Sequence, residues 1–224
     1  MIPAVIHCFW AQGRRTPLAE RCLASWRTLA PGWEIREWTL ADFPTLPRFC
    51  ADAVRRRQWA FVSDWVRFEA LHREGGVYFD LDLELIRPID GLPSGEWVAG
   101  EWTARGGTAM NPGAGIALEK QSPIAKAMLD HYSSAEPGDR TTVGEILGAL
   151  DAAKTLRTLD PETLSPIGVD GRLHRSERTI GIHRYAMSWA SPKQRILRWM
   201  SWHGMRPLID AALRVKWAMR GGPA

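Results

Sequence analysis

The sequence predicts a mixed α/β fold, because stretches with helical periodicity lead directly into stretches that alternate or are continuously apolar. Two such pairs are clear: residues 17–29 precede residues 33–38, and residues 60–72 precede residues 77–86. The chain has 224 residues, of which 45% are hydrophobic, and this is sufficient for one sizeable domain with a small appendage. No stretch reaches the ~20 apolar residues of a membrane-spanning helix.

The first part of the chain is predicted to alternate between strands and helices. Residues 2–10 form a short apolar run, expected to be a buried strand, and lack the features of a signal peptide. Apolar side chains recur at helical spacing over residues 17–29, and Pro31-Gly32 ends that helix. Residues 33–38 alternate, as a strand does. The basic run 55–57 is expected on a further helix or at its end.

The next helix is expected over residues 60–72, with Ser63 as its N-cap and Gly75-Gly76 as its end. Beyond residue 86 the expected elements are shorter. They are strands at 97–101 and 114–118, a helix at 123–132 and β-rich structure over 165–184. The three cysteines match no metal-ligand spacing, so reduced thiols in a cytosolic protein are expected.

The segment Val77–Ile86 carries the strongest functional signal. One face of the predicted strand is apolar, and the other carries Tyr78, Asp80, Asp82 and Glu84. Three carboxylates on one face repel one another, and crowding them is costly unless a cation lies nearby. A divalent metal would supply that charge, and oxygen ligands suit magnesium or manganese.

A regular strand would place the Cα atoms of Asp80 and Asp82 roughly 6.5 Å apart. Metal–oxygen bonds are only about 2–2.6 Å long, so both carboxylates can bind one ion directly only if the strand bends. A split of roles is therefore expected, in which one carboxylate binds the ion and the other binds it through water or holds a ligand hydroxyl. Asp64 and Arg67 share one face of the preceding helix and are expected at its N-terminal end, which favours anionic groups.

Six segments carry a resemblance to a known family, and they occur in that family's order. They are residues 2–10, 31–38, 60–67, 75–82, 87–90 and 182–189. The central segments resemble the sugar-binding DXD region of glycosyltransferase family 32, which includes bacterial capsule and lipid-glycan transferases and fungal mannosyltransferases. They are also similar to the glucosylating domains of large clostridial toxins. The outer segments resemble the family's first two strands and its closing His-His-x-x-x-Ser-Trp segment.

This resemblance implies a GT-A-like, Rossmann-like fold with a mixed central sheet, and a nucleotide-sugar donor held through Mn²⁺ or Mg²⁺. A UDP-sugar is the favoured donor, and GDP-mannose stays open. The sugar would be transferred, with retention of its anomeric configuration, to a glycan or lipid-linked acceptor in cell-surface glycan or glycolipid synthesis.

The resemblance also implies residue roles. The residues of the sugar and catalytic site would be Asp64, Arg67, Asp80, Asp82 and Asn111. The residues that hold the nucleotide would be Trp10 at the base, Asp80 at the ribose, and Ser188 and Trp189 at the diphosphate. The metal ligands would be Asp82 and His183. Two residues depart from the family's pattern, because Arg184 replaces a second His and Met187 replaces a small residue. With Arg184 in place of a second His, the number of metal ligands stays open. The cation at Arg184 could instead offset the charge of the diphosphate.

The C-terminal segment, residues 191–224, is basic and rich in tryptophan. This pattern suits an amphipathic helix lying on an anionic membrane surface. It equally suits a helix packed on the domain with a solvated basic face. The expected organisation is a catalytic domain at residues 1–190 and a helical tail, in a cytoplasmic protein that is peripheral on the inner face of the membrane if the tail binds lipid. No nucleic-acid-binding motif is present, so nucleic acid is not an expected partner.

Two other functions remain as alternatives at the level of sequence. A phosphohydrolase could use Asp80 and Asp82 as a catalytic pair. That chemistry requires a Gly/Thr-type turn after Asp82, whereas this chain continues with Leu83-Glu84-Leu85. A non-catalytic, membrane-associated interaction domain would leave the acidic strand without a chemical role.

Overall fold

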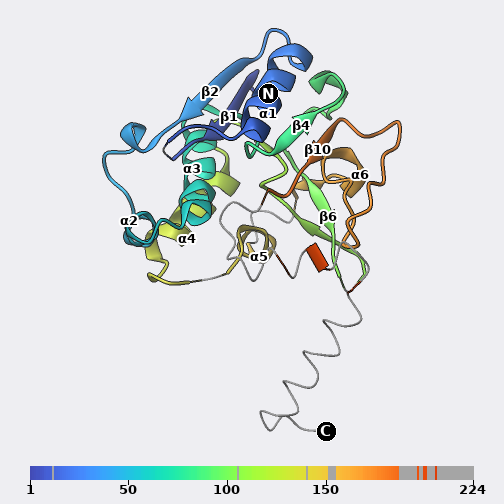
Figure 1. Cartoon of the computed structure of the whole chain (residues 1–224). Coiled ribbons are helices and arrows are strands. Elements are labelled where there is room, and N and C mark those ends of the chain that lie inside the picture. The colour runs from blue at the N-terminus through green and yellow to red at the C-terminus, as the bar shows by residue number, and fades with distance from the viewer. Residues whose placement is uncertain are drawn as a thin grey trace, which may run out of the picture.

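The computed structural model describes residues 1–11, 13–104, 106–139, 141–150 and 155–186, together with 196, 199, 200 and 205. It confirms a mixed α/β fold (Figure 1). The strands of its largest sheet are β1 (Val5–Phe9), β2 (Glu34–Trp38), β3 (Gly76–Tyr78), β5 (Trp97–Val98), β8 (Ile116–Leu118) and β9 (Arg157–Thr158). They lie in the order β2-β1-β3-β8-β5-β9. Two further sheets have two strands each: β4 (Leu83–Leu85) with β10 (Gly181–His183), and β6 (Gly100–Trp102) with β7 (Thr108–Met110).

The strand directions decide which residues meet at one edge of the central sheet. β1 runs parallel to β2 and to β3, whereas β8 runs antiparallel to β3 and to β5. The carboxyl ends of β1 and β3 therefore lie side by side. Trp10 and Asp80, which follow these two strands, are placed at that edge. Carboxyl ends of parallel strands are common positions for ligand sites.

Alternate side chains of the central sheet enter two hydrophobic clusters. Phe9 and Tyr78 belong to one cluster, whereas Cys8 and Phe79 belong to the other. The first cluster is completed by α2 (Arg48–Arg55), α3 (Trp59–Glu74), α4 (Pro123–Ser134) and α5 (Val143–Ala149). The second is completed by α1 (Pro17–Leu29), α6 (Pro161–Leu164) and β4. The sheet is thus covered on both faces, with α1 and α3 on opposite sides (Figure 1).

The predicted helices are present, with one correction at α3. α1 has the predicted bounds, because Thr16 caps its N-terminus with a hydrogen bond from Ala19 N (3.1 Å). α3 begins at Trp59, and Ser63 lies inside it rather than at its N-cap, donating its hydroxyl to Ala60 O (2.8 Å). Asp64 therefore lies beyond the first turn of α3, where the helix dipole has little effect.

The predicted continuous strand Val77–Ile86 is wrong. β3 ends at Tyr78, the chain turns, and β4 begins at Leu83 in a different sheet. Two backbone hydrogen bonds hold the turn: Leu83 N donates to Asp80 O (2.9 Å), and Asp80 N donates to Gly113 O (3.0 Å). The strand therefore bends between the two aspartates.

Three other expectations have different outcomes. The predicted strand 97–101 is divided between β5 and β6, and the described part of 165–184 contains only β10 and an isolated bridge between Ile167 and Leu173. The tail, apart from four described residues, lies outside the described part of the chain, so the boundary at residue 190 stays a prediction. In the described residues, no helix combines the length and the apolar character needed to cross a bilayer.

One buried histidine links β1 to its neighbours. Nδ1 of His7 accepts a hydrogen bond from Trp38 Nε1 (3.0 Å), and Nε2 lies 2.7 Å from Gly75 O. Because Nδ1 accepts, the proton lies on Nε2, which donates to the carbonyl oxygen. Burial lowers the pKa of His7 to about 4, although the hydrogen bond to Gly75 opposes this shift. The imidazole is therefore neutral in the folded protein near pH 7.

We expect the free energy of unfolding to fall as the pH drops from 6.5 to about 4, because the unfolded chain binds a proton on His7 that the folded chain excludes. The full loss from this group is ~3 kcal/mol. His7→Gln can still donate to Gly75 and accept from Trp38, yet it does not titrate, so it should lack this component. Urea denaturation of both proteins across that pH range measures the difference. Equal pH dependence in the two proteins would contradict the assignment.

Candidate functional site

The turn after β3 is fixed by the loop that precedes β8. Asp80 N donates to Gly113 O, and a Cβ atom at position 113 would lie 2.5 Å from Asp80 Oδ2. A side chain at position 113 would therefore displace the Asp80 carboxylate. Asp80 is consequently held at the sheet edge with its side chain 32% exposed.

Asp82 is brought against His183 by the pairing of β4 with β10. His183 lies opposite Leu83 in that pair, and Arg184 N donates to Asp82 O (2.8 Å). As a result, His183 Nε2 lies 3.0 Å from Asp82 Oδ1. Asp80, Asp82 and His183 each offer one ligand atom, and these three atoms lie within 4.8 Å of one another. The bend in the chain thus brings both carboxylates to one point, which the straight strand expected from sequence would not do.

The donor set of this cluster fits a divalent cation. Asp82 Oδ2 accepts a hydrogen bond from Ala186 N (2.8 Å), but Asp82 Oδ1 is buried and has no hydrogen-bond partner among the described residues. Its short contact with His183 Nε2 lacks hydrogen-bond geometry. An orphaned buried carboxylate oxygen is costly unless a cation satisfies it. Two carboxylates and one imidazole are suitable ligands for Mn²⁺ and, less closely, for Mg²⁺.

The pKa shifts of Asp82 and His183 follow from their contact with each other. Burial would raise the pKa of Asp82, but His183 and the N–H of Ala186 outweigh it and lower the pKa below its usual value. Burial alone would lower the pKa of His183, but the neighbouring Asp82 carboxylate raises it. Asp82 is therefore a carboxylate at neutral pH, available to bind a cation.

Arg67 is a buried cation between two carboxylates. Its side chain is 1% exposed; Nη1 donates to Asp64 Oδ1 (2.9 Å) and Nη2 to Asp80 Oδ1 (3.0 Å). The guanidinium carbon lies 4.8 Å from the centre of the Tyr78 ring. Burial raises the pKa of Asp64 to about 6, with Arg67 opposing the shift. Burial also raises the pKa of Asp80, again opposed by Arg67. The predicted association of Asp64 and Arg67 with the acidic turn is present.

Asn111 lies between this cluster and a carboxylate that the sequence did not indicate. Asn111 Nδ2 donates to Glu101 Oε2 (2.9 Å) and lies 3.5 Å from His183 Nδ1. Tyr185 donates its hydroxyl to the same oxygen of Glu101 (3.0 Å). Glu101 ends a segment predicted as a strand and has no motif around it. No local signal could have identified it, because its partners come from β7's end and from beyond β10.

The remaining predicted residues fall into two groups. Trp10 follows β1 and is half-buried, and its Nε1 donates to Gly13 O (2.8 Å) rather than entering the core. Ser188 and Trp189 lie outside the described residues, as does Met187. Of the nucleotide-binding set, only Trp10 and Asp80 are therefore placed, both at the carboxyl edge of the sheet.

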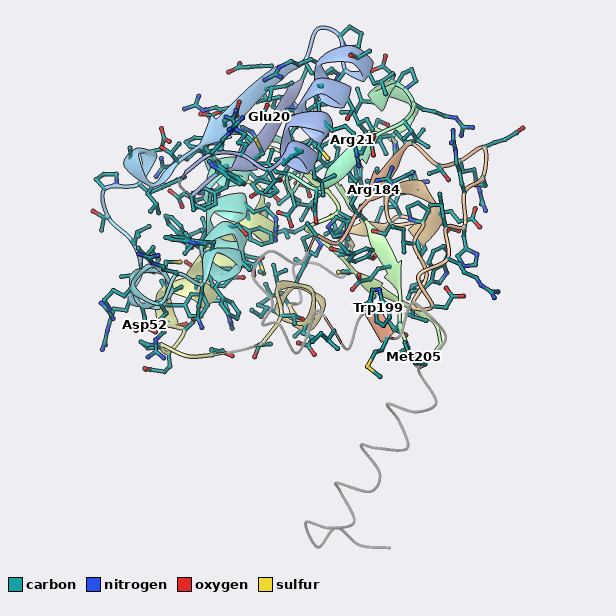
Figure 2. The ribbon with its side chains drawn as sticks, in the orientation of Figure 1. Glu20, Arg21, Asp52, Arg184, Trp199 and Met205 are labelled. Carbon is teal, nitrogen blue, oxygen red and sulfur yellow. The ribbon has the colours of Figure 1, made fainter. Side chains whose placement is uncertain are left out.

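Arg184 is engaged elsewhere than in the metal cluster. Its Nε donates to Glu84 Oε2 (2.9 Å), and Arg21 Nε lies 3.2 Å from Glu84 Oε1. Figure 2 shows Arg21 on α1 and Arg184 just beyond β10 on the same side of the molecule. Glu84 thus joins α1 to the β4–β10 pair, and the role of Arg184 in offsetting diphosphate charge stays a prediction.

Comparison with known proteins agrees with this geometry. Residues 18–99 match the family model described as "Glycosyltransferase sugar-binding region containing DXD motif". No curated protein matches the chain. A solved structure named PaToxG glycosyltransferase has a TM-score of 0.50 and 19% identity, covering 65% of this chain and 65% of its own. A second, a glycosyltransferase involved in glycosylation of the major capsid of PBCV-1, has a TM-score of 0.52 and 14% identity, covering 86% of this chain and 98% of its own.

The chain thus spans about 65% of the length of the PaToxG structure, and at these identities the two structures establish the fold. The family match covers Asp64, Arg67, Asp80 and Asp82, which form the turn and its buried cation. The fold is that of GT-A-like glycosyltransferases, and the matched region is the one that contains their sugar-binding motif. Over residues 18–99 the chain is therefore similar to DXD-containing glycosyltransferases.

Proposed function

We propose that the protein is a metal-dependent, retaining glycosyltransferase that takes a sugar from a nucleotide-sugar donor, with UDP favoured and GDP-mannose open. The acceptor is a glycan or a lipid-linked glycan. The observation that carries the proposal is the convergence of Asp80, Asp82 and His183 on one point beside the buried Arg67. This arrangement supports a glycosyltransferase over the phosphohydrolase, because Asp80 is held by a guanidinium rather than poised as a nucleophile.

The metal is assigned to Asp82 and His183, with Asp80 close enough to complete the set. When bound, a divalent ion offsets the negative charge of the diphosphate leaving group. Asp82 Oδ1 has no hydrogen-bond partner among the described residues, so a bound cation would stabilise this carboxylate most. The backbone N–H of Ala186 holds its other oxygen and fixes the orientation of the carboxylate.

The donor sugar is assigned to Asp64, Arg67 and Asp80. Arg67 opposes the effect of burial on the pKa of both carboxylates and fixes their positions, so that they accept hydrogen bonds from sugar hydroxyls. Trp10, half-buried at the same edge of the sheet, is assigned to the nucleobase, on which an exposed indole can stack.

Retention of configuration is proposed to need no covalent sugar–enzyme intermediate. Arg67 holds one oxygen each of Asp64 and Asp80, and Asp82 is assigned to the metal, so none of these carboxylates is assigned as a nucleophile. The bond from the anomeric carbon to the diphosphate breaks as the acceptor oxygen attacks the same face, and the departing phosphate oxygen takes the acceptor's proton. Detection of a sugar covalently attached to Asp64 or Asp80 by mass spectrometry would contradict this route.

Calorimetric titration tests the donor assignment. UDP and GDP are titrated into the protein with Mn²⁺ and again with EDTA. Binding of one nucleotide only in the presence of the metal supports the proposal and identifies the donor class. Binding of neither would overturn it.

Asp82→Asn should weaken Mn²⁺-dependent nucleotide binding by about 100-fold or more, because the amide removes the anionic oxygen that faces the ion. Calorimetry with and without Mn²⁺ measures this loss. Asp90→Asn, an exposed aspartate on the short 3-10 helix Ile89–Gly91, is the matched control and should bind normally. Undiminished Mn²⁺-dependent binding by Asp82→Asn would show that the metal assignment is wrong.

Arg67→Met should lower the free energy of unfolding by about 3–5 kcal/mol, because it leaves two carboxylates without their buried counter-charge. Denaturant unfolding measures the loss. Lys126→Met removes an exposed ion pair to Asp130 on α4 and should cost only about 0.5 kcal/mol. The double variant Asp64→Asn/Arg67→Met should recover part of the loss. Equal stabilities of Arg67→Met and Lys126→Met would contradict the structural role given to Arg67.

For the tail we propose contact with an anionic membrane surface, which would place the enzyme on the cytoplasmic face of the membrane. Ile196 and Trp199 are 58% and 55% exposed in a segment rich in Lys and Arg. Trp199 and Met205 lie together at the lower edge of the described structure (Figure 2). Exposed apolar side chains among cations suit the interface of anionic lipids.

Sedimentation with vesicles tests this contact. The full chain should co-sediment with phosphatidylglycerol vesicles, and less with phosphatidylcholine vesicles. Ile196→Glu/Trp199→Glu should reduce the bound fraction by about tenfold, because charge is introduced at both apolar positions. Val169→Glu/Leu173→Glu changes two other exposed apolar residues and is the control. Equal loss in both double variants, or no binding by the full chain, would contradict the proposal.

A further inference from the structure

A cavity of about 530 Å³ lies beside the metal cluster and has no role in the function proposed above. Its walls come from the β6–β7 hairpin, from α5 and its N-terminal cap, and from β9. Cavities of about 300–1,000 Å³ are typical of small-molecule sites. Its size is therefore sufficient for one or two sugar rings.

The divergence of α5 from β7 opens this cavity. At Gly144 the two elements are in direct contact, because a Cβ atom there would lie 2.3 Å from Met110 O. One helical turn later, a Cβ atom at Gly148 would meet nothing within 4 Å. Gly144 and Gly148 share one face of the helix, and both line the cavity. The space is thus wedge-shaped, closed at Gly144 and open at Gly148.

The polar groups that line the cavity accept hydrogen bonds from hydroxyls. Two of them are the carboxylates of Glu101 and Glu145, and three are the hydroxyls of Thr108, Thr142 and Thr158. Hydrogen bonds from Thr142 lower the pKa of Glu145, which is therefore ionised at neutral pH. None of the described lining residues is cationic. Such a lining suits a polyhydroxyl compound and disfavours a phosphate group.

Glu101 connects the cavity to the metal cluster. Its Oε2 accepts the hydrogen bonds from Asn111 and Tyr185, while Oε1 has no hydrogen bond among the described residues. Asn111 Nδ2 is also 3.5 Å from His183 Nδ1, and His183 Nε2 is 3.0 Å from Asp82 Oδ1. Three successive contacts therefore separate a ligand at Glu101 from the site assigned to the metal.

We infer that this cavity is the acceptor site, and that it takes a saccharide without negative charge, bound through its hydroxyls to Glu101 and to the threonines. The inference rests on the proposed function, since an acceptor site requires a donor site beside it. The diphosphate of the donor is not a candidate occupant, because it would face two carboxylates. A phosphorylated acceptor is excluded for the same reason.

Gly148→Trp tests the inference by filling the open end of the cavity without displacing any neighbour of the glycine. Saturation-transfer NMR is recorded with lactose and with the methyl glycosides of glucose, galactose, mannose and N-acetylglucosamine, each at about 10 mM, where weak sugar sites are populated. UDP and Mn²⁺ are present throughout. The wild type should bind at least one of these neutral saccharides, and Gly148→Trp should reduce its signal by about tenfold. Glucose 6-phosphate should give no signal.

Ala149→Trp is the matched control, because it places the same side chain at the exposed neighbouring position of α5, which is not among the described residues that line the cavity. It should bind saccharides as the wild type does. Equal binding by Gly148→Trp, binding of glucose 6-phosphate, or no saccharide binding by the wild type would each overturn the inference. Calorimetric titration of nucleotide with Mn²⁺ into the same variants distinguishes failure of this inference from failure of the proposed function. Gly148→Trp should bind nucleotide with Mn²⁺ normally, whereas absence of that binding in the wild type would reject the donor assignment itself.

Discussion

The turn between β3 and β4 is the constraint on which the site depends. A continuous strand would have projected Asp80 and Asp82 in parallel from one sheet, too far apart to share an ion. The bond from Asp80 N to Gly113 O bends the chain there, and the bond from Leu83 N to Asp80 O closes the turn. β4 is thereby free to pair with β10, which brings His183 from a distant part of the sequence against Asp82. The geometry of the site therefore depends on where β3 ends.

The charge balance follows from that turn. Arg67 offsets the charge of Asp64 and Asp80, and burial of a guanidinium is tolerable because both of its terminal nitrogens are paired and the Tyr78 ring lies nearby. Asp82 remains as an ionised carboxylate with an unsatisfied oxygen. The site as a whole is therefore negative. The divalent cation that we propose would offset this negative charge.

Much of the fold could be predicted from sequence because its signals are local. Thr16 and Pro17 mark the start of α1, and helical periodicity fixes its face. The end of β3 could not be predicted, because alternation continues across the turn: Val77 and Leu83 are buried whether the strand bends or not. The bond that bends it comes from Gly113, which is distant in sequence. The predicted N-cap at Ser63 is wrong for a related reason. A serine inside a helix can donate its hydroxyl to a carbonyl of the preceding turn instead of capping the N-terminus.

Glu101 is the residue of the site that the sequence could not indicate, and it lies outside the region that matches the family model. The residues matched by the glycosyltransferase family, 18–99, contain the turn and Arg67, whereas Glu101, Asn111 and His183 lie beyond them. The region that matches the family model therefore builds the side of the site to which we assign the donor. The β6–β7 hairpin and α5, outside that region, build the cavity. Glu101 and Asn111 connect the lining of the cavity to the metal cluster. In our proposal, the donor side and the acceptor side are thus built by different parts of the chain.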